Sequence, residues 1–257
     1  MATKSKIEWT QSTWNPVRGC TRVSEGCRFC YAERIAARFS GKGMAYEGLV
    51  KTTKTGPKWT SKIQTIPELL EAPLKWKKSQ LIFVNSMSDL FHEDVSLPFI
   101  SQVFDVMERA HWHQFQVLTK RSQRLSELSD KIHWPKNVWM GVSIENQDCT
   151  SRIDCLRKTG AAIKFLSLEP LIGPLTDLKL ESIDWVIVGG ESGYGARPIQ
   201  KEWVIDIREQ CKTYGVPLFV KQMGSAWAQA SQAKDKKGGD ISEWPADLQI
   251  RNYPFYF

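Results

Sequence analysis

Three of the six cysteines in the chain, Cys20, Cys27 and Cys30, lie within eleven residues of one another. Cys27 and Cys30 form a Cys-x-x-Cys pair, which lets two thiolates turn toward one metal centre, and Cys20 returns to it across a loop that contains Gly19 and Gly26. A structural zinc site needs four ligands, whereas a cubane iron–sulfur cluster held by three cysteines keeps one iron open. The loop therefore leaves three alternatives: an iron–sulfur cluster, three of the four ligands of a zinc site, or thiols that bind no metal.

An aromatic residue, Phe29, stands immediately before Cys30 and favours the cluster. In this respect the loop resembles that of radical SAM enzymes, which carry three cysteines with an aromatic before the third. The first gap differs, because six residues separate Cys20 from Cys27 where that family usually has three. The resemblance implies a [4Fe-4S] cluster whose open iron binds the amino and carboxylate groups of S-adenosyl-L-methionine (SAM). It also implies reductive cleavage of SAM to a 5′-deoxyadenosyl radical that abstracts hydrogen from a substrate.

The sequence around the cysteines also resembles a phage-associated family known for its three-cysteine motif. The likeness covers most of the chain and is carried by residues 7–10, 13–16, 30–34, 85–92, 189–192 and 220–222.

From residue 81 onward, short apolar segments alternate with helical ones. Strands are predicted at residues 81–85, 115–119, 138–142, 163–167, 185–188 and 218–221, and helices at 31–39, 99–110, 121–131, 149–158 and 202–214. This alternation predicts parallel βαβ units, and one more strand before the cysteine loop brings the number to about seven. With 257 residues, the chain fits a single (β/α) TIM-type barrel, complete or partial, with an N-terminal cysteine loop. Radical SAM enzymes use the same scaffold.

Polar residues follow each of the predicted strands from residue 81 onward, and the active sites of such barrels lie at the C-terminal ends of the strands. A helix cap explains any single Ser, Asp or Asn, but six strands that end in this way predict a shared pocket. The candidate cofactor-binding residues are Phe29, Ser143, Glu145, Ser167, Glu169, Gly189, Gly190 and Glu191. The candidate substrate-binding residues are Asn85, Ser88, Asp89, Lys120, Arg121, Lys221 and Gln222. No catalytic residue is assigned.

The Gly189-Gly190-Glu191 run resembles the radical SAM motif whose backbone and acid engage the SAM amino group. It follows a late strand, whereas in that family the motif follows an early one. Glu191 is therefore a pocket acid by position, and Gly190 serves equally well as a turn residue.

The length and composition predict one domain over residues 1–257. Residues 40–66 are rich in Gly, Lys and Thr, which is typical of a lid or binding loop and equally of disorder. Residues 224–257 form a C-terminal extension that ends in aromatic residues, which we expect to dock on the barrel as a plug or to form a partner-binding patch.

The net charge of +7 and the isoelectric point near 9.1 fit a polyanionic partner such as nucleic acid, and they equally fit a plain solvated basic surface. No apolar run approaches the roughly 18 residues of a membrane span, and no apolar secretory segment stands at the N-terminus. We therefore expect a cytoplasmic protein whose thiols stay reduced and free to bind metal.

Two hypotheses follow. The first is a radical SAM-like enzyme that needs an electron donor protein and acts on a substrate such as nucleic acid, with a further partner protein left open. The second is a nucleic-acid-binding module without catalysis, in which zinc or a redox-silent cluster only stabilises the N-terminal loop.

Overall fold

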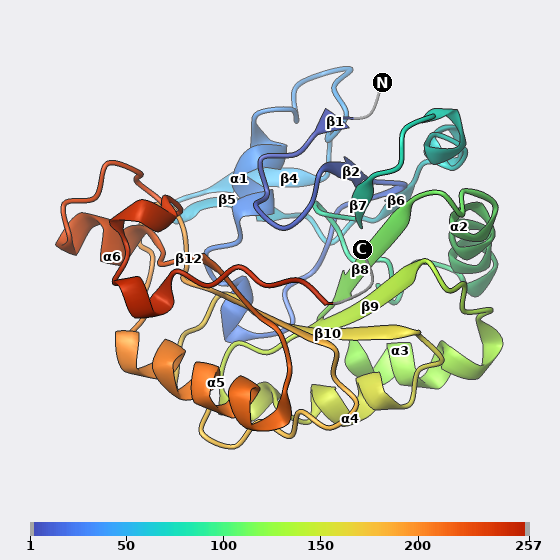
Figure 1. Ribbon diagram of the computed structural model, residues 1–257. Coiled ribbons are helices and arrows are strands. Elements are labelled where there is room, and N and C mark those ends of the chain that lie inside the picture. Colours follow the sequence, from blue (N-terminus) through green and yellow to red (C-terminus); the bar gives the residue numbers. More distant parts are fainter. Residues whose placement is uncertain (1–2, 255–257) are drawn as a thin grey trace. The chain divides into compact units, whose positions relative to one another are not determined.

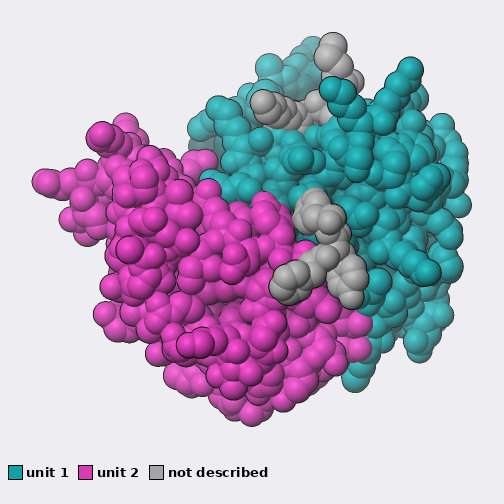
Figure 2. Space-filling view, viewed as in Figure 1, with its two compact units in different colours: residues 1–23, 30–140, 158–162 teal, residues 24–29, 141–157, 163–257 magenta. Residues whose placement is uncertain are grey.

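The computed structural model describes residues 3–254, and the chain divides into two compact units (Figure 2). The first unit comprises residues 1–23, 30–140 and 158–162, and the second comprises residues 24–29, 141–157 and 163–257. The cysteine loop is therefore shared: Cys20 and Cys30 belong to the first unit and Cys27 to the second.

The main sheet has eight strands in the order β1-β2-β7-β8-β9-β10-β11-β12 (Figure 1). Their bounds are β1 Thr3–Lys4, β2 Ser12–Trp14, β7 Leu81–Val84, β8 Gln114–Thr119, β9 Val138–Ser143, β10 Ile163–Leu168, β11 Trp185–Gly189 and β12 Leu218–Gln222. The pairs β2–β7 and β7–β8 in the first unit are parallel, as are β10–β11 and β11–β12 in the second, while β1 pairs antiparallel with β2. The strands follow chain order and the sheet is open in the described residues. Of the two predicted alternatives, a complete or a partial (β/α) barrel, the sheet is therefore of the partial type.

The sheet strands are almost wholly apolar and buried, as expected for parallel strands covered on both faces. The helices are α1 Tyr31–Ala37, α2 Leu97–Arg109, α3 Ser122–Leu128, α4 Arg152–Arg157, α5 Lys201–Tyr214 and α6 Ser225–Ala230. Helix α2 begins where Ser96 Oγ accepts a hydrogen bond from Phe99 N at 3.4 Å, and α5 ends at Gly215 with φ of 67°. The predicted strands from residue 81 onward and the five predicted helices all lie within a few residues of these bounds.

Residues 40–66, predicted as a lid or a disordered segment, contain a β-hairpin of β4 (Val50–Thr53) and β5 (Gly56–Trp59). Two further short strands, β3 (Val17–Arg18) and β6 (Gln64–Thr65), pair antiparallel. Trp59 belongs to a buried cluster that includes Ala32 and Ala36 of α1. The segment is therefore not disordered, because the apolar face of the hairpin packs on α1. A lid role stays a prediction.

The C-terminal extension is packed within the second unit. Tyr253 stacks on Trp185 with ring centroids 5.3 Å apart, and Arg251 lies over the rings of Phe219 and Trp244. The last three residues of the aromatic end, predicted to dock on the barrel or to form a partner-binding patch, lie outside the described residues. No helix in the described part of the chain is long and apolar enough to cross a membrane.

Candidate functional site

The polar residues predicted to gather at strand ends do stand there. In the first unit, the segment from Asn85 to Asp89 follows β7, and Lys120 and Arg121 follow β8. In the second unit, the corresponding residues are Ser143 and Glu145 at the end of β9, Ser167 and Glu169 at the end of β10, Gly190 and Glu191 after β11, and Lys221 and Gln222 in β12.

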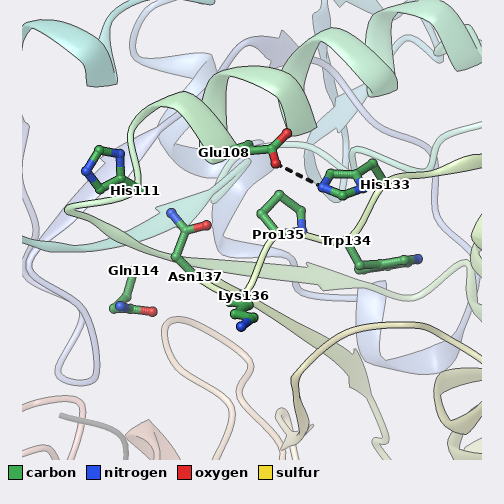
Figure 3. A pocket seen from close by; sticks show the side chains of 8 residues that line it. All are labelled: Glu108, His111, Gln114, His133, Trp134, Pro135, Lys136 and Asn137. Atoms are coloured by element: carbon green, nitrogen blue, oxygen red, sulfur yellow. Dashed lines mark hydrogen bonds and ion pairs between the residues drawn. The ribbon is translucent and has the colours of Figure 1, made fainter.

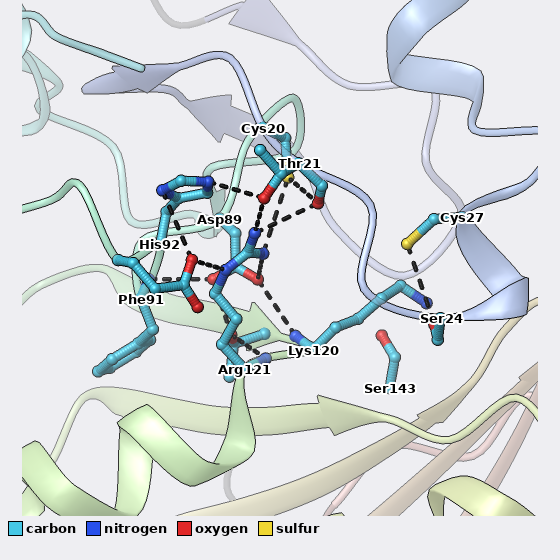
Figure 4. A network of polar contacts seen from close by, with 12 residues as sticks. Cys20, Thr21, Ser24, Cys27, Asp89, Phe91, His92, Lys120, Arg121 and Ser143 are labelled. Atoms are coloured by element: carbon cyan, nitrogen blue, oxygen red, sulfur yellow. Dashed lines mark hydrogen bonds and ion pairs between the residues drawn. The ribbon is translucent and has the colours of Figure 1, made fainter. Parts of the chain in front are cut away.

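Asp89 and Arg121 form a buried ion pair in the first unit, with 3.1 Å between Asp89 Oδ2 and Arg121 Nη1 (Figure 4). Each residue is only 5% exposed. Asp89 Oδ1 also accepts from Thr119 Oγ1 at 2.7 Å and from Phe91 N at 3.0 Å, and its Oδ2 accepts from Lys120 N at 3.2 Å. Asp89 therefore links the segment that follows β7 to the segment that follows β8.

Arg121 also reaches the cysteine segment of the same unit. Its Nη2 donates to the carbonyl oxygen of Thr21 at 3.2 Å and to Thr21 Oγ1 at 2.5 Å, and its Nη1 lies 3.9 Å from Cys20 Sγ. Burial alone would lower the pKa of Arg121, but Asp89, Glu93 and the charge of a Cys20 thiolate outweigh it, so the pKa lies above its usual value. A fixed positive charge beside Cys20 favours the thiolate, the form that binds metal.

His92 and Glu93 complete this network. Thr21 Oγ1 lies 2.9 Å from His92 Nε2, and Arg121 Nε donates to Glu93 Oε2 at 2.9 Å. Burial and the charge of Arg121 lower the pKa of His92, so the ring stays neutral near pH 7. Burial raises the pKa of Glu93, but the hydrogen bond and charge of Arg121 outweigh it and hold the pKa below its usual value.

The chain before Cys20 is fastened to the end of β7. Ser88 Oγ donates to the carbonyl oxygen of Val17 at 2.7 Å, and Val17 N donates to Asn85 Oδ1 at 3.4 Å. Gly19 has φ of 85°, and a Cβ there would lie 2.1 Å from the carbonyl oxygen of Lys62, so only glycine fits. The predicted substrate-binding residues Asn85 and Ser88 thus position the cysteine segment in this structure.

Cys20 and Cys30 pack against one apolar cluster of the first unit, which contains Ala32, Ala36, Tyr46, Leu49, Trp59 and Met87. Beside it, the buried Glu33 accepts from Arg22 Nε and from Trp59 N, both at 3.1 Å. Sequence reasoning did not single out Glu33 or Arg22. Glu33 occurs three residues after Cys30, on the face of α1 that also buries Ala32 and Ala36, and a carboxylate in that position is a signal for a buried ion pair.

Cys27 lies in the second unit beside a second buried acid. Ser24 Oγ donates to Glu145 Oε1 at 2.7 Å and lies 3.9 Å from Cys27 Sγ. Glu145 is 1% exposed, and its Oε2 accepts from Arg152 Nη1 at 2.8 Å. A Cβ at Gly26 would lie 2.4 Å from Glu145 Cγ, so the loop passes directly over this acid. Glu145, predicted to bind cofactor, supports the loop segment that carries Cys27.

Glu191 is bound to a residue that sequence reasoning missed, Arg197. Glu191 Oε2 accepts from Arg197 N and Nε, both at 2.9 Å, and its Oε1 accepts from Nη2 at 2.7 Å. The same guanidinium donates to the carbonyl oxygen of Glu25 at 3.0 Å and lies 5.7 Å from the centroid of the Phe29 ring. Arg197 therefore ties the acid of the Gly-Gly-Glu run to the cysteine loop within the second unit. Its position in an irregular Gly-rich segment offered no sequence signal.

The glycines of that run are explained by close packing of the backbone. A Cβ at Gly190 would lie 2.5 Å from the carbonyl oxygen of Met223, and Gly190 N donates to the carbonyl oxygen of Gln222 at 2.9 Å. Nearby, Lys221 Nζ forms an ion pair with Glu169 Oε1. Gln222 Nε2 donates to the carbonyl oxygen of Gly190 at 2.9 Å, so these predicted ligand-binding groups contact one another.

None of the six cysteines forms a disulfide bond. Between residues 3 and 254, no group of three or more His, Cys, Asp or Glu side chains is gathered closely enough to hold a metal ion. The donors themselves, three thiols without disulfide partners, are those that an iron–sulfur cluster takes. A cluster assignment therefore rests on the donor types and their spacing.

A depression of about 510 Å³ lies at the other ends of the strands in the first unit, lined by residues that include Glu108, Gln114, His133 and Asn137 (Figure 3). Gln114 begins β8 and Asn137 immediately precedes β9, so the depression is next to the N-terminal ends of these strands. Active sites of (β/α) barrels lie at the opposite ends. This depression is not the candidate site.

Residues 4–244 match the family model described as "Protein of unknown function (DUF5131)". The chain belongs to the DUF5131 family. No curated protein matches it.

Several solved structures of spore photoproduct lyase, a radical SAM enzyme, share the fold of this DUF5131 chain. A cysteine-to-serine mutant has a TM-score of 0.51 at 14% identity, over 82% of this chain and 63% of the lyase. The lyase complexed with dinucleoside spore photoproduct gives a TM-score of 0.51 at 13% identity over the same shares. A cysteine-to-alanine mutant gives 0.50 at 12% identity, over 92% of this chain and 64% of the lyase. The chain thus spans less than two thirds of the lyase, and at these identities the likeness shows the fold alone.

Proposed function

We propose that this protein is a radical SAM-type enzyme in which Cys20, Cys27 and Cys30 hold a [4Fe-4S] cluster with one iron open to SAM. The observation that carries the proposal is the combination of three cysteines within one loop, none of them in a disulfide, and a partial (β/α) barrel fold resembling a radical SAM enzyme. When bound, the cluster supplies the electron for the reductive cleavage of SAM. A reducing cytoplasm and an electron donor protein belong to this proposal.

The protein's own side chains would position the loop and tune its thiols. Arg121 supports the Cys20 thiolate, and Glu145 supports the segment that carries Cys27 through Ser24. In the second unit, Ser143 and Ser167 are buried at strand ends and remain candidate SAM-binding residues, together with Glu169. The compound bound to the structural relative in one of its structures is a dinucleoside, and we extend only the general class, nucleic acid, to this chain.

A second candidate function is a nucleic-acid-binding module in which zinc or a redox-silent cluster stabilises the loop. The net charge of +7 supports this second function, because a basic surface binds a polyanion whether or not the protein is an enzyme. The two proposals differ in the metal and in the response to SAM.

Anaerobic reconstitution with iron and sulfide, followed by metal and sulfide analysis, separates them. We expect about four irons with equivalent sulfide in the wild type, and 5′-deoxyadenosine on addition of SAM and reductant. Replacing Cys20, Cys27 or Cys30 with Ser should abolish iron binding, whereas Cys155→Ser, on α4, should not change it. One zinc without sulfide, or full iron in all three variants, would refute the cluster assignment.

A further inference from the structure

The positive charge of the chain is concentrated in one short segment of the first unit. Residues 38–62 carry a net charge of +5, from Arg38 and five lysines against Glu47, out of +7 for the whole chain. Among the described residues, neither Arg38 nor Lys42, Lys51, Lys54, Lys58 or Lys62 forms an ion pair. We call residues 38–62 the basic segment. The charges of the basic segment therefore do not stabilise the fold through ion pairs.

The hairpin in this segment turns its lysines away from the body of the unit. Side chains alternate between the two faces of a strand, and Val50 and Trp59, which pair across the hairpin, both pack toward α1. The next pair, Lys51 and Lys58, therefore lies on the opposite face, directly across from each other. Like charges in such a pair repel, and no acid offsets them here. An anion bound on this face would relieve the repulsion.

Exposed apolar side chains occur in the same stretch of sequence as these charges. Seven large apolar residues are exposed in the part of the chain that the structure describes, and five of them, Val23, Tyr31, Ile35, Phe39 and Met44, lie between residues 23 and 44. Phe39 is 51% exposed, and its carbonyl oxygen accepts from Tyr46 N at 2.9 Å. Tyr46 in turn contacts Trp59, with ring centroids 6.4 Å apart, so Phe39 is held next to the hairpin. Trp59 itself is only 8% exposed and is not free to stack on a ligand.

We propose that the basic segment binds single-stranded nucleic acid, with Lys42, Lys51, Lys54 and Lys58 contacting phosphates and Phe39 stacking on an unpaired base. Repeated phosphates match a segment with several lysines that form no ion pair, and an exposed ring in the same segment accepts a base that is not in a duplex. An acidic protein surface would match the charge but would not require the ring. The binding does not depend on a cluster, so it goes beyond the proposed enzymatic function and stands or fails separately.

The test is fluorescence anisotropy on the full chain with a labelled single-stranded DNA of about 16 nucleotides, at salt concentrations from about 50 to 200 mM. Duplex DNA and polyglutamate serve as further probes, and iron content is recorded in parallel. In one variant Lys42, Lys51, Lys54 and Lys58 are replaced with Gln. The matched control replaces Lys77, Lys78, Lys236 and Lys237, all exposed, and removes the same charge.

We expect the four-lysine variant to bind single-stranded DNA at least about tenfold more weakly and to show a flatter salt dependence, because each neutralised phosphate contributes about 0.7 to the logarithmic slope. The control should stay within about twofold of the wild type. Phe39→Ala should weaken binding by about 5- to 150-fold, whereas Tyr214→Ala, a change at another exposed ring, should not.

Any of four results would overturn the proposal. These are no binding at low salt, equal losses in the four-lysine variant and its control, stronger binding of duplex, and polyglutamate binding as tight as that of single-stranded DNA. Unchanged iron content in the four-lysine variant would show that a loss of binding is not a loss of the proposed cluster.

Discussion

The Asp89–Arg121 pair offers the sharpest test of how the cysteine segment is held. In Asp89→Asn the amide oxygen can still accept from Thr119 and Phe91, but an NH₂ group then faces Arg121 and Lys120 N, which are both donors. Breaking a buried ion pair costs about 3–5 kcal/mol. Glu93 still pairs with Arg121 and is largely exposed, so we expect the lower end, about 3 kcal/mol.

For a chain of this size, about 3 kcal/mol corresponds to a fall in melting temperature of roughly 6–12 °C. Asp105→Asn is the matched control, because it makes the same chemical change in an exposed pair with Arg109 that contributes about 0.3–0.5 kcal/mol. Thermal unfolding followed by tryptophan fluorescence measures both variants.

A second readout distinguishes local loosening from general destabilisation. Arg121 holds Thr21, the neighbour of Cys20, so Asp89→Asn should speed the alkylation of Cys20 under native conditions, followed by peptide mass spectrometry. Cys155, on α4, should react at an unchanged rate. If Asp89→Asn melted within about 2 °C of Asp105→Asn and Cys20 reacted no faster, the reasoning would be wrong.

Two further predictions concern pH and the loop. Burial lowers the pKa of His113 below its ordinary value of 6.5, so the unfolded chain binds more protons below that pH, and stability is lost as the pH falls from about 7 to 5. Urea unfolding across this range measures the free energy of unfolding, which should depend less on pH in His113→Gln than in the wild type. His111→Gln, which changes an exposed ring, should keep the wild-type dependence. Equal pH slopes in the wild type and both variants would contradict the assignment to His113. Arg197→Met should speed hydrogen exchange in residues 24–29, whereas Arg208→Met, which removes a surface ion pair on α5, should leave that peptide unchanged; equal exchange in both would reduce Arg197 to a surface contact.

The regular elements were predictable because their signals are local. The apolar runs that became β7 to β12 are buried on both faces, and the capping Ser96 and the terminal Gly215 mark helix ends by their chemistry. The hairpin at β4 and β5 was not predicted, since each strand has four residues and only Val50 and Trp59 mark its apolar face. The sequence of residues 67–77 also favours a short helix that contains a proline. That prediction is wrong in type, because two 3-10 turns, each beginning with a proline, stand there.

The placement of polar residues at the strand ends was predictable from the sequence, and the pairing among these residues was less so. Strand order places the polar residues at one edge, but which acid meets which base depends on loop paths that leave no periodic signal. Arg121 to Asp89 is a case of this kind, since Arg121 follows β8 and Asp89 follows β7. Arg197 lies only six residues after Glu191, but both stand in an irregular loop. The phage association stays a prediction.

The pairing of Glu191 bears directly on where SAM would bind. Sequence resemblance assigns this carboxylate to the ammonium group of SAM, yet it is 4% exposed and already accepts three hydrogen bonds from Arg197. SAM could bind there only by displacing a guanidinium, which exchanges one charge-assisted set of bonds for another and also frees the carbonyl oxygen of Glu25. Such an exchange yields little net binding energy and loosens the loop that carries Cys27. We infer that Glu191 serves to position the cysteine loop and that the SAM amino group is bound by other residues of the strand ends.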